Sequence, residues 1–278
     1  TQVHPCKFDF TTLLTYQSYL LALAAGNLKS SPIGPRSLIW SEPETLQAGA
    51  EEFVDTEKFI SAAESLVGEY EWKTYDLLLL PPSFPYGGME NPQLTFVTPT
   101  LLDGKKSNVS VVAHEIAHSW TGNLVTTSNW AHFWLNEGFT VFLERKILRK
   151  IYGEDFMQFD ALLGLNDLNE AIASMEKRGD PYTNLVPNIG TNDPDDAFST
   201  IPYEKGFNLL YYLQKLVGGD AVFEPFFKSW IQNVSFSWKE ISPSQHKTKS
   251  VSTKDFIEYF TAAFPDTKVD WPSWTDKQ

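Results

Sequence analysis

Two histidines four residues apart, followed later by a glutamate, are the residues whose types and spacing most directly suggest chemistry. His114, Glu115 and His118 form H-E-x-x-H, and Glu137 follows after eighteen further residues, within Asn-Glu-Gly. On a helix, side chains four positions apart project from one face, so both imidazoles can reach one ion. Two neutral imidazoles and one carboxylate form the ligand set of an open catalytic zinc site. The pattern predicts zinc bound by His114, His118 and Glu137, with Glu115 placed to deprotonate a water.

The residues around this motif favour the metal over a purely structural role. The predicted helix is otherwise apolar, through Val111, Val112, Ala113, Ile116 and Ala117. Uncompensated polar groups in such a helix would be costly, and a metal would compensate them. The alternative is a buried helix whose histidines and glutamates form a hydrogen-bonded cluster. Because Glu137 opens a second predicted helix after a turn-rich loop, the sequence favours zinc.

A pair of glycines marks a second candidate region. Gly87 and Gly88 precede Met89 and Glu90 in a loop between two predicted strands. Paired glycines let a substrate backbone pass close to the protein, and the Glu90 carboxylate can bind the free α-ammonium group of a peptide. The alternative is an ordinary loop with a solvated glutamate. Beside a zinc site, the ammonium anchor is favoured, and it predicts removal of one residue at a time.

Three further residues are candidates because of their positions. Pro202 fits the first turn of a helix, so Tyr203 lies at a helix start, where its hydroxyl can stabilise an oxyanion or its ring can simply pack. Glu144 lies seven residues after Glu137 on one helical face, so it can accept a hydrogen bond from a ligand imidazole or be a surface charge. Asp195 lies in a loop leading to Tyr203, where it can reach the cleft or cap a turn.

Short strands followed by helices must position these residues. The predicted strands are residues 19–24, 37–40, 75–80 and 94–98, and the predicted helices are residues 57–66, 107–121, 135–152, 154–174, 203–217, 221–233 and 253–264. A small sheet followed by a mainly helical lobe predicts an α+β fold, with the metal helix between the two parts.

Composition limits the classes of function. The net charge of −13 argues against nucleic acid and against an anionic membrane surface as partners, because few cations are present to neutralise phosphates. The apolar run at residues 77–80 is far too short to span a membrane. The single cysteine, Cys6, fits a reducing compartment, so we expect a cytoplasmic protein that can also be nuclear.

Four motifs together resemble the leukotriene A4 hydrolase and aminopeptidase B branch of zinc aminopeptidases, and fungal members most of all. They are H-E-I-A-H-S-W-T-G-N, W-L-N-E-G-F-T, P-Y-G-G-M-E-N-P and P-Y-E-K-G. The resemblance covers residues 7–275 and implies a thermolysin-like catalytic domain over residues 29–278. It also implies that residues 1–28 are the end of an N-terminal β-domain, and that the family's C-terminal helical domain lies outside this sequence.

The resemblance also implies roles for individual residues. The implied ligands of one zinc ion are His114, His118 and Glu137. Glu115 corresponds to the general base and Tyr203 to the group that stabilises the transition state. Glu90 corresponds to the anchor of the substrate amine, and Gly88 lies in the loop that makes the enzyme an exopeptidase. Asp195 corresponds to an acid that family members use in epoxide hydrolysis.

We therefore expect a zinc-dependent aminopeptidase that acts on peptides with a free N-terminus. One alternative is an enzyme that also hydrolyses a lipid epoxide, although Phe198 stands where the vertebrate hydrolase has a tyrosine. Another is a zinc-binding domain with little activity in the absence of the N- and C-terminal domains of a parent chain. The aromatic residues around the motif predict either a substrate pocket or core packing; they are Trp130, Phe133 and Trp134, with Met89 beside them.

Overall fold

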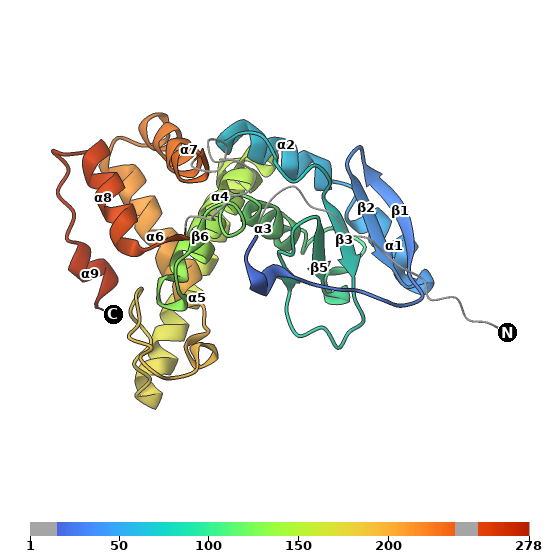
Figure 1. The fold of residues 1–278 in the computed structure, drawn as a ribbon, viewed down its shortest axis with the longest axis horizontal. Helices are drawn as coiled ribbons and strands as arrows, with labels where there is room; N and C mark the ends of the chain where they lie inside the picture. The colour runs from blue at the N-terminus through green and yellow to red at the C-terminus, as the bar shows by residue number, and fades with distance from the viewer. Residues whose placement is uncertain (1–15, 237–249, 278) are drawn as a thin grey trace, which may run out of the picture.

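The computed structural model describes residues 16–236 and 250–277 as a sheet lobe followed by a helical lobe (Figure 1). The sheet lobe comprises a 3-10 helix at Ser18–Leu20, strands β1 (Lys29–Gly34) and β2 (Ser37–Ser41), helices α1 (Pro43–Glu52) and α2 (Thr56–Val67), and strands β3 (Asp76–Leu79), β4 (Gly88–Met89) and β5 (Leu94–Val97). The strand order is β1-β2-β3-β5-β4. The fold is α+β, as predicted.

The five-stranded sheet is mixed. The outer strands β1 and β4 pair antiparallel with their neighbours, and the inner pairs β2–β3 and β3–β5 are parallel. Strand β3 is central, and Leu77, Leu78 and Leu79 are all buried, which is typical of a strand covered on both faces. Because β4 is the last strand in this order, the loop with the paired glycines becomes an edge strand of the sheet.

The helical lobe is built around one long buried helix. Its elements are α3 (Ser110–His118), strand β6 (Thr126–Thr127), α4 (Trp134–Tyr152), α5 (Glu154–Arg178), α6 (Ile201–Leu216), α7 (Asp220–Phe236), strand β7 (Ser250–Val251), α8 (Thr253–Ala263) and α9 (Trp271–Thr275). Helix α4 is buried along most of its length and contacts α2, α3, α5 and α6. In the described part of the chain, no helix is both long and apolar enough to cross a membrane.

The core is continuous between the two lobes and rich in aromatic side chains. Phe139 of α4 packs against Trp134 of its own helix and against Phe256 of α8, with ring centroids 5.6 and 5.1 Å apart. Phe142, one turn further on, contacts Phe223 of α7 at 5.5 Å. These contacts hold α4 rigidly between α3 and the C-terminal helices, so the residues that it presents to the cleft have a fixed frame.

Most of the predicted elements are confirmed, with ends that differ by a few residues. The strands at residues 37–40, 75–80 and 94–98 correspond to β2, β3 and β5, and every predicted helix is present. Strand β1 and helix α1 were not predicted. The proposed boundary between residues 28 and 29 stays a prediction, and residues 1–15 of that first segment lie outside the described residues.

The predicted strand at residues 19–24 is wrong. Residues 18–20 form a 3-10 helix, and residues 21–25 have no regular structure. Within the described residues, no strand pairs with this segment. Leu20 is instead buried in the body of the protein, and the Tyr19 ring lies edge-on to Trp130 at 5.0 Å. Tertiary packing therefore overrides the local preference of this apolar run for a strand.

Candidate active site

Helices α3 and α4 bring three predicted ligands to one point. His114 and His118, one turn apart on α3, have their Nε2 atoms 3.1 Å from each other. The Oε2 atom of Glu137, in the first turn of α4, lies 3.3 and 3.2 Å from these two nitrogens. This oxygen is buried and has no hydrogen-bond partner of acceptable geometry among the described residues. The two imidazole nitrogens are also within hydrogen-bond distance of each other, so their relation depends on which ring nitrogens carry the protons.

The outer nitrogens of the two imidazoles fix the tautomers. His114 Nδ1 lies 2.9 Å from Glu144 Oε2, and His118 Nδ1 lies 2.9 Å from the carbonyl oxygen of Thr121. Carboxylate and carbonyl oxygens only accept hydrogen bonds, so each Nδ1 carries the proton. In the neutral rings, both Nε2 atoms therefore present lone pairs toward each other and toward Glu137.

This donor set fits a zinc ion. Two lone pairs and a carboxylate oxygen repel one another at such distances unless a cation lies between them. Two imidazole nitrogens and one carboxylate oxygen are ligands that zinc prefers, and the hydrogen bonds to Nδ1 orient the rings as in known metal sites. His114, His118 and Glu137 are the residues that would hold the ion.

The negative charges around the cluster show why a cation suits it. Burial lowers the pKa of His118, but the nearby Glu137 and Glu90 carboxylates outweigh burial and raise that pKa to about 9. Burial raises the pKa of Glu137, and the two histidines together lower it to about 2. The protein surroundings therefore already favour positive charge at the point where the three ligand atoms meet.

Glu115 lies against the edge strand β4. A Cβ atom added to Gly88 would come within 2.3 Å of Glu115 Oε1, so only glycine lets the strand approach this carboxylate. Burial raises the pKa of Glu115 to about 8. A carboxyl group with a pKa near neutrality can both accept and return a proton, which suits a general base.

Glu90 lies beside Glu115 in the same site. It is 8% exposed, and its carboxylate oxygen, a carboxylate oxygen of Glu115 and a ring nitrogen of His118 lie within 4.8 Å of one another. Asn123 Nδ2 donates a hydrogen bond to the backbone carbonyl of Glu90 at 2.8 Å. This bond holds the backbone, so the side chain is left for a ligand in the cleft.

Tyr203 also lines the cleft, in the first turn of α6, as predicted from Pro202. Its ring stacks on His114 with centroids 5.9 Å apart, and Phe133 and Phe198 contact its edges. Burial and then the Glu137 charge raise the pKa of its hydroxyl well above the usual value. The hydroxyl therefore keeps its proton and can donate a hydrogen bond.

A cleft of about 1000 Å³ connects all these residues. The sequence left open whether the aromatic residues near the motif form a substrate pocket or pack in the core. They line this cleft, namely Trp130, Phe133 and Trp134, together with Met89. Trp134 is also fully buried, so this residue serves the core and the wall. Asp195 lies on the rim beside Phe198, in a 3-10 helix at Pro194–Ala197 whose start is capped by Asp193. The structure thus places every sequence-predicted site residue in or behind one cleft.

Two contributors were not predicted. The Thr140 hydroxyl, in α4, lies 3.1 Å from His118 Nδ1 and donates to the Thr121 carbonyl, so it helps to hold that imidazole. A lone threonine one turn after Glu137, in an otherwise apolar stretch, was the available signal. Tyr19 lines the cleft and accepts a hydrogen bond from Asn136 Nδ2 at 3.3 Å. No local pattern in the sequence connects Tyr19 to the motif.

Known proteins with the same features were identified by comparison. The model of the peptidase family M1 domain matches residues 52–271. Leukotriene A-4 hydrolase of Xenopus laevis is 51% identical over 272 residues, which are 96% of this chain and 42% of that protein. Leucine aminopeptidase 2 of Saccharomyces cerevisiae is 46% identical over 277 residues, which are 97% of this chain and 39% of that protein. This chain therefore spans about two fifths of the length of these relatives.

Solved structures agree with this assignment. The structure of yeast LTA4 hydrolase in complex with bestatin superposes with a TM-score of 0.83 at 48% identity, over 91% of this chain and 39% of that one. An M1 zinc metallopeptidase from Deinococcus radiodurans, at 20% identity and a TM-score of 0.60, shares the fold. With its matched domain, its relatives and the convergent histidines and glutamate, this chain belongs to peptidase family M1.

Proposed function

We propose that this chain is the catalytic part of a zinc-dependent aminopeptidase that removes the first residue from peptides with a free N-terminus. The observation that carries this proposal is the closeness of Glu90 to Glu115 and His118, within 4.8 Å. In a peptide, the α-amino nitrogen and the carbonyl carbon of the first residue are about 2.5 Å apart, as the bond lengths require. An ammonium group held by Glu90 therefore presents the first peptide bond, and no later one, to Glu115.

Each residue of the site has a separate role in the proposed reaction. A bound zinc ion would lower the pKa of a water and polarise the scissile carbonyl. Glu115 accepts the proton of the attacking water and passes it to the leaving amine. The Tyr203 hydroxyl donates a hydrogen bond to the oxygen on which negative charge develops. Glu90 holds the substrate ammonium and fixes the register of the peptide.

A matched pair of substrates tests this proposal. A leucyl chromogenic amide and its N-acetylated twin are offered to one preparation, whose zinc content is measured by metal analysis. We expect about one zinc per chain, the stoichiometry of a three-ligand catalytic site, and cleavage of the free amine only. Equal cleavage of both substrates would contradict the role of Glu90 as the anchor. A zinc-loaded chain that cleaves neither substrate would contradict the activity proposed for this chain.

One observation favours a second activity, the hydrolysis of a lipid epoxide. Asp195 lies on the rim of the same cleft, and the named relatives include leukotriene A-4 hydrolase. We propose that the Asp195 carboxylate places a water on the epoxide. Asp195→Asn should then abolish epoxide turnover and leave peptide cleavage within about twofold, since the carboxylate is not used there. Equal loss of both activities would argue against a separate role.

A further inference from the structure

A buried ion pair joins α4 to α6 directly behind the cleft. Arg145 is 3% exposed, and its Nη1 and Nη2 atoms donate to Glu204 Oε2 and Oε1, both at 2.8 Å. Its Nε atom donates to Asp160 Oδ2 at 2.7 Å, and the ring of Phe207 lies 4.2 Å from its Cζ. A guanidinium held on two edges and one face has a single orientation, so it also fixes the direction of Glu204.

Each partner of this pair is next in sequence to a residue of the candidate site. Arg145 follows Glu144, which lies 2.9 Å from His114 Nδ1. Glu204 follows Tyr203, whose ring stacks on His114. Successive residues of a helix point about 100° apart, so α4 and α6 each present one side chain toward the cleft and the next one to their shared interface. The ion pair thus joins the two helices whose side chains contact His114.

The closest contact between α4 and α6 does not by itself fix how α6 is rotated. Helices α4 and α6 touch at Gly138 and Gly206, where a Cβ added to Gly138 would lie 2.6 Å from the Gly206 Cα. Two glycines provide no interlocking side chains at this point of contact. On α5, a Cβ added to Gly164 would lie 2.2 Å from Glu204 Oε2 and 2.3 Å from Arg145 Nη2. Helix α5 therefore leaves a space that the ion pair fills.

We propose that Arg145 is a positioning residue, which acts through Glu204 to place the Tyr203 hydroxyl for the reaction. This rests on the proposed function, because it assigns Tyr203 a task in that reaction. A buried ion pair is a poor source of stability, since loss of hydration offsets its attraction. A bidentate pair does supply direction, and a misplacement of about 1 Å in a reacting group can cost about a hundredfold in rate.

Arg145→Lys is the first test, because it keeps the charge and loses the planar fork. We expect kcat for the leucyl substrate to fall by about tenfold to a hundredfold, with KM and zinc content nearly unchanged. Gly164→Ala should change kcat in the same direction, because the added methyl group displaces the pair without altering either partner.

The next residue on α4 provides a matched control. Lys146 is 2% exposed and pairs with Asp220 and Glu224 of α7, so it too is a buried cation in an ion pair between helices. Neither of these partners lines the cleft that contains Tyr203. Lys146→Met should therefore lower the unfolding temperature while kcat stays within about twofold. If Arg145→Lys and Lys146→Met have the same effect on kcat, the positioning role is overturned.

A double variant separates a positioning role of Arg145 from a nonspecific disturbance of the structure. In a Tyr203→Phe background there is no hydroxyl to place, so Arg145→Lys should cause no further loss of kcat. If the losses of the two single variants multiply in the double variant, Arg145 acts independently of Tyr203 and the proposal is wrong.

A spectroscopic measurement makes the test independent of turnover. In fluorotyrosine-labelled protein, the fluorine resonance of Tyr203 is assigned by its loss in Tyr203→Phe. It should shift in Arg145→Lys and stay in place in Lys146→Met. An unmoved resonance in Arg145→Lys overturns the proposal. An inactive wild-type chain with a shifted resonance in Arg145→Lys would count against the proposed function and not against the positioning by Arg145.

Discussion

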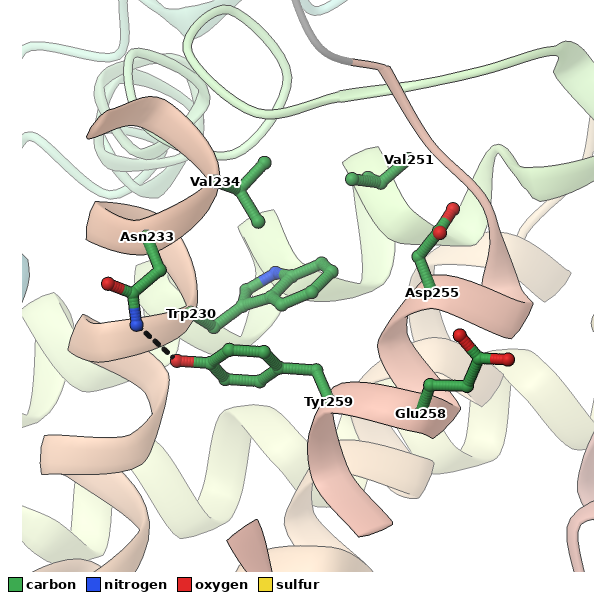
Figure 2. Close-up of a pocket in the computed structure, with 7 residues that line it drawn as sticks. All are labelled: Trp230, Asn233, Val234, Val251, Asp255, Glu258 and Tyr259. Carbon is green, nitrogen blue, oxygen red and sulfur yellow. Dashed lines mark hydrogen bonds between the residues drawn. The ribbon is translucent and has the colours of Figure 1, made fainter. Parts of the chain in front are cut away.

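Two hollows of this molecule are lined by acidic and aromatic side chains, and they differ in how their polar groups are satisfied. The smaller one, of about 340 Å³, lies between α7 and α8 (Figure 2). Its lining comprises Trp230, Asn233, Val234, Val251, Asp255, Glu258 and Tyr259. By residue type alone, both hollows are candidate sites.

The polar groups of the smaller hollow are engaged by nearby partners. Asn233 Nδ2 donates to the Tyr259 hydroxyl at 2.7 Å, as Figure 2 shows. Asp255 Oδ2 accepts from the backbone and the hydroxyl of Ser252 in a capping box. Glu258 lies 3.6 Å from Lys254 on the same helix. These groups stabilise the start of α8 and its contact with α7, and they converge on no common point.

The groups of the large cleft converge instead, from α3, α4 and β4. Glu137 Oε2 is buried without a hydrogen bond and faces two imidazole nitrogens, while Glu90 and Glu115 lie beside them. Buried polar groups without partners lower the free energy of unfolding, and a bound ligand that pairs with them raises it again. The comparison teaches that convergence and incomplete satisfaction, more than residue type, mark a reaction site.

Replacement of the base should have the largest effect. Glu115→Gln keeps the volume and removes the proton acceptor, so kcat should fall about a thousandfold. Zinc content should stay the same, because Glu115 is not among the three ligands. Steady-state kinetics and metal analysis of the same sample provide the measurement. Turnover at the wild-type rate would end the assignment of Glu115 as base.

Removal of the partner of His114 should have the next largest effect. Glu144→Ala deletes the acceptor that orients the imidazole, so zinc affinity should fall by roughly tenfold to a hundredfold. Competition with a zinc chelator measures this affinity. Glu258→Ala, in the smaller hollow, is the matched control and should leave it unchanged. If both variants bind zinc with the same affinity, the large cleft does not differ from the smaller hollow in its part in zinc binding.

Neutralisation of the anchor should have a smaller effect. Glu90→Gln replaces an ion pair to the substrate ammonium with a hydrogen bond, so KM for free-amine substrates should rise by about tenfold. The Asn123 bond to the Glu90 backbone should hold the loop in place. Peptide kinetics identical to those of the wild type would show that the amine is bound elsewhere.

Loss of the cap on α8 should have the smallest effect. Ser252→Ala removes one half of the capping box, so the free energy of unfolding should fall by about 1 kcal/mol. Urea titration measures this change. Activity should be unaltered, because α8 serves structure. A drop in kcat without a loss of stability would show that the smaller hollow takes part in the reaction.

Features that depend on one helix or one loop could be predicted from the sequence. The spacing of His114 and His118 fixes their common face, and Pro202 fixes the start of α6. Contacts between distant segments could be predicted only where a motif implies them, as for Glu137 and the two histidines. The sequence left two roles open for Glu144, a surface charge or the acceptor of a hydrogen bond from an imidazole. Only the packing of α3 on α4 shows that its carboxylate lies 2.9 Å from His114 Nδ1.

The same limit explains the features that were missed. Arg145 and Glu204 are 59 residues apart, and no local pattern pairs them. The segment at residues 19–24 is an apolar run like that of a strand, but a strand needs a neighbour, which a local pattern cannot supply. The cytoplasmic location rests on the single cysteine of the sequence and stays a prediction.

The central claim is that α3 and α4 hold a zinc ion through His114, His118 and Glu137. X-ray absorption at the zinc edge, on protein equilibrated with zinc and freed of excess metal, tests it most directly. We predict about one zinc per chain with two imidazole nitrogens and oxygen ligands at about 2.0–2.2 Å, and loss of that signal in His118→Ala. Protein that retains no zinc, or an unchanged spectrum in His118→Ala, would contradict the account.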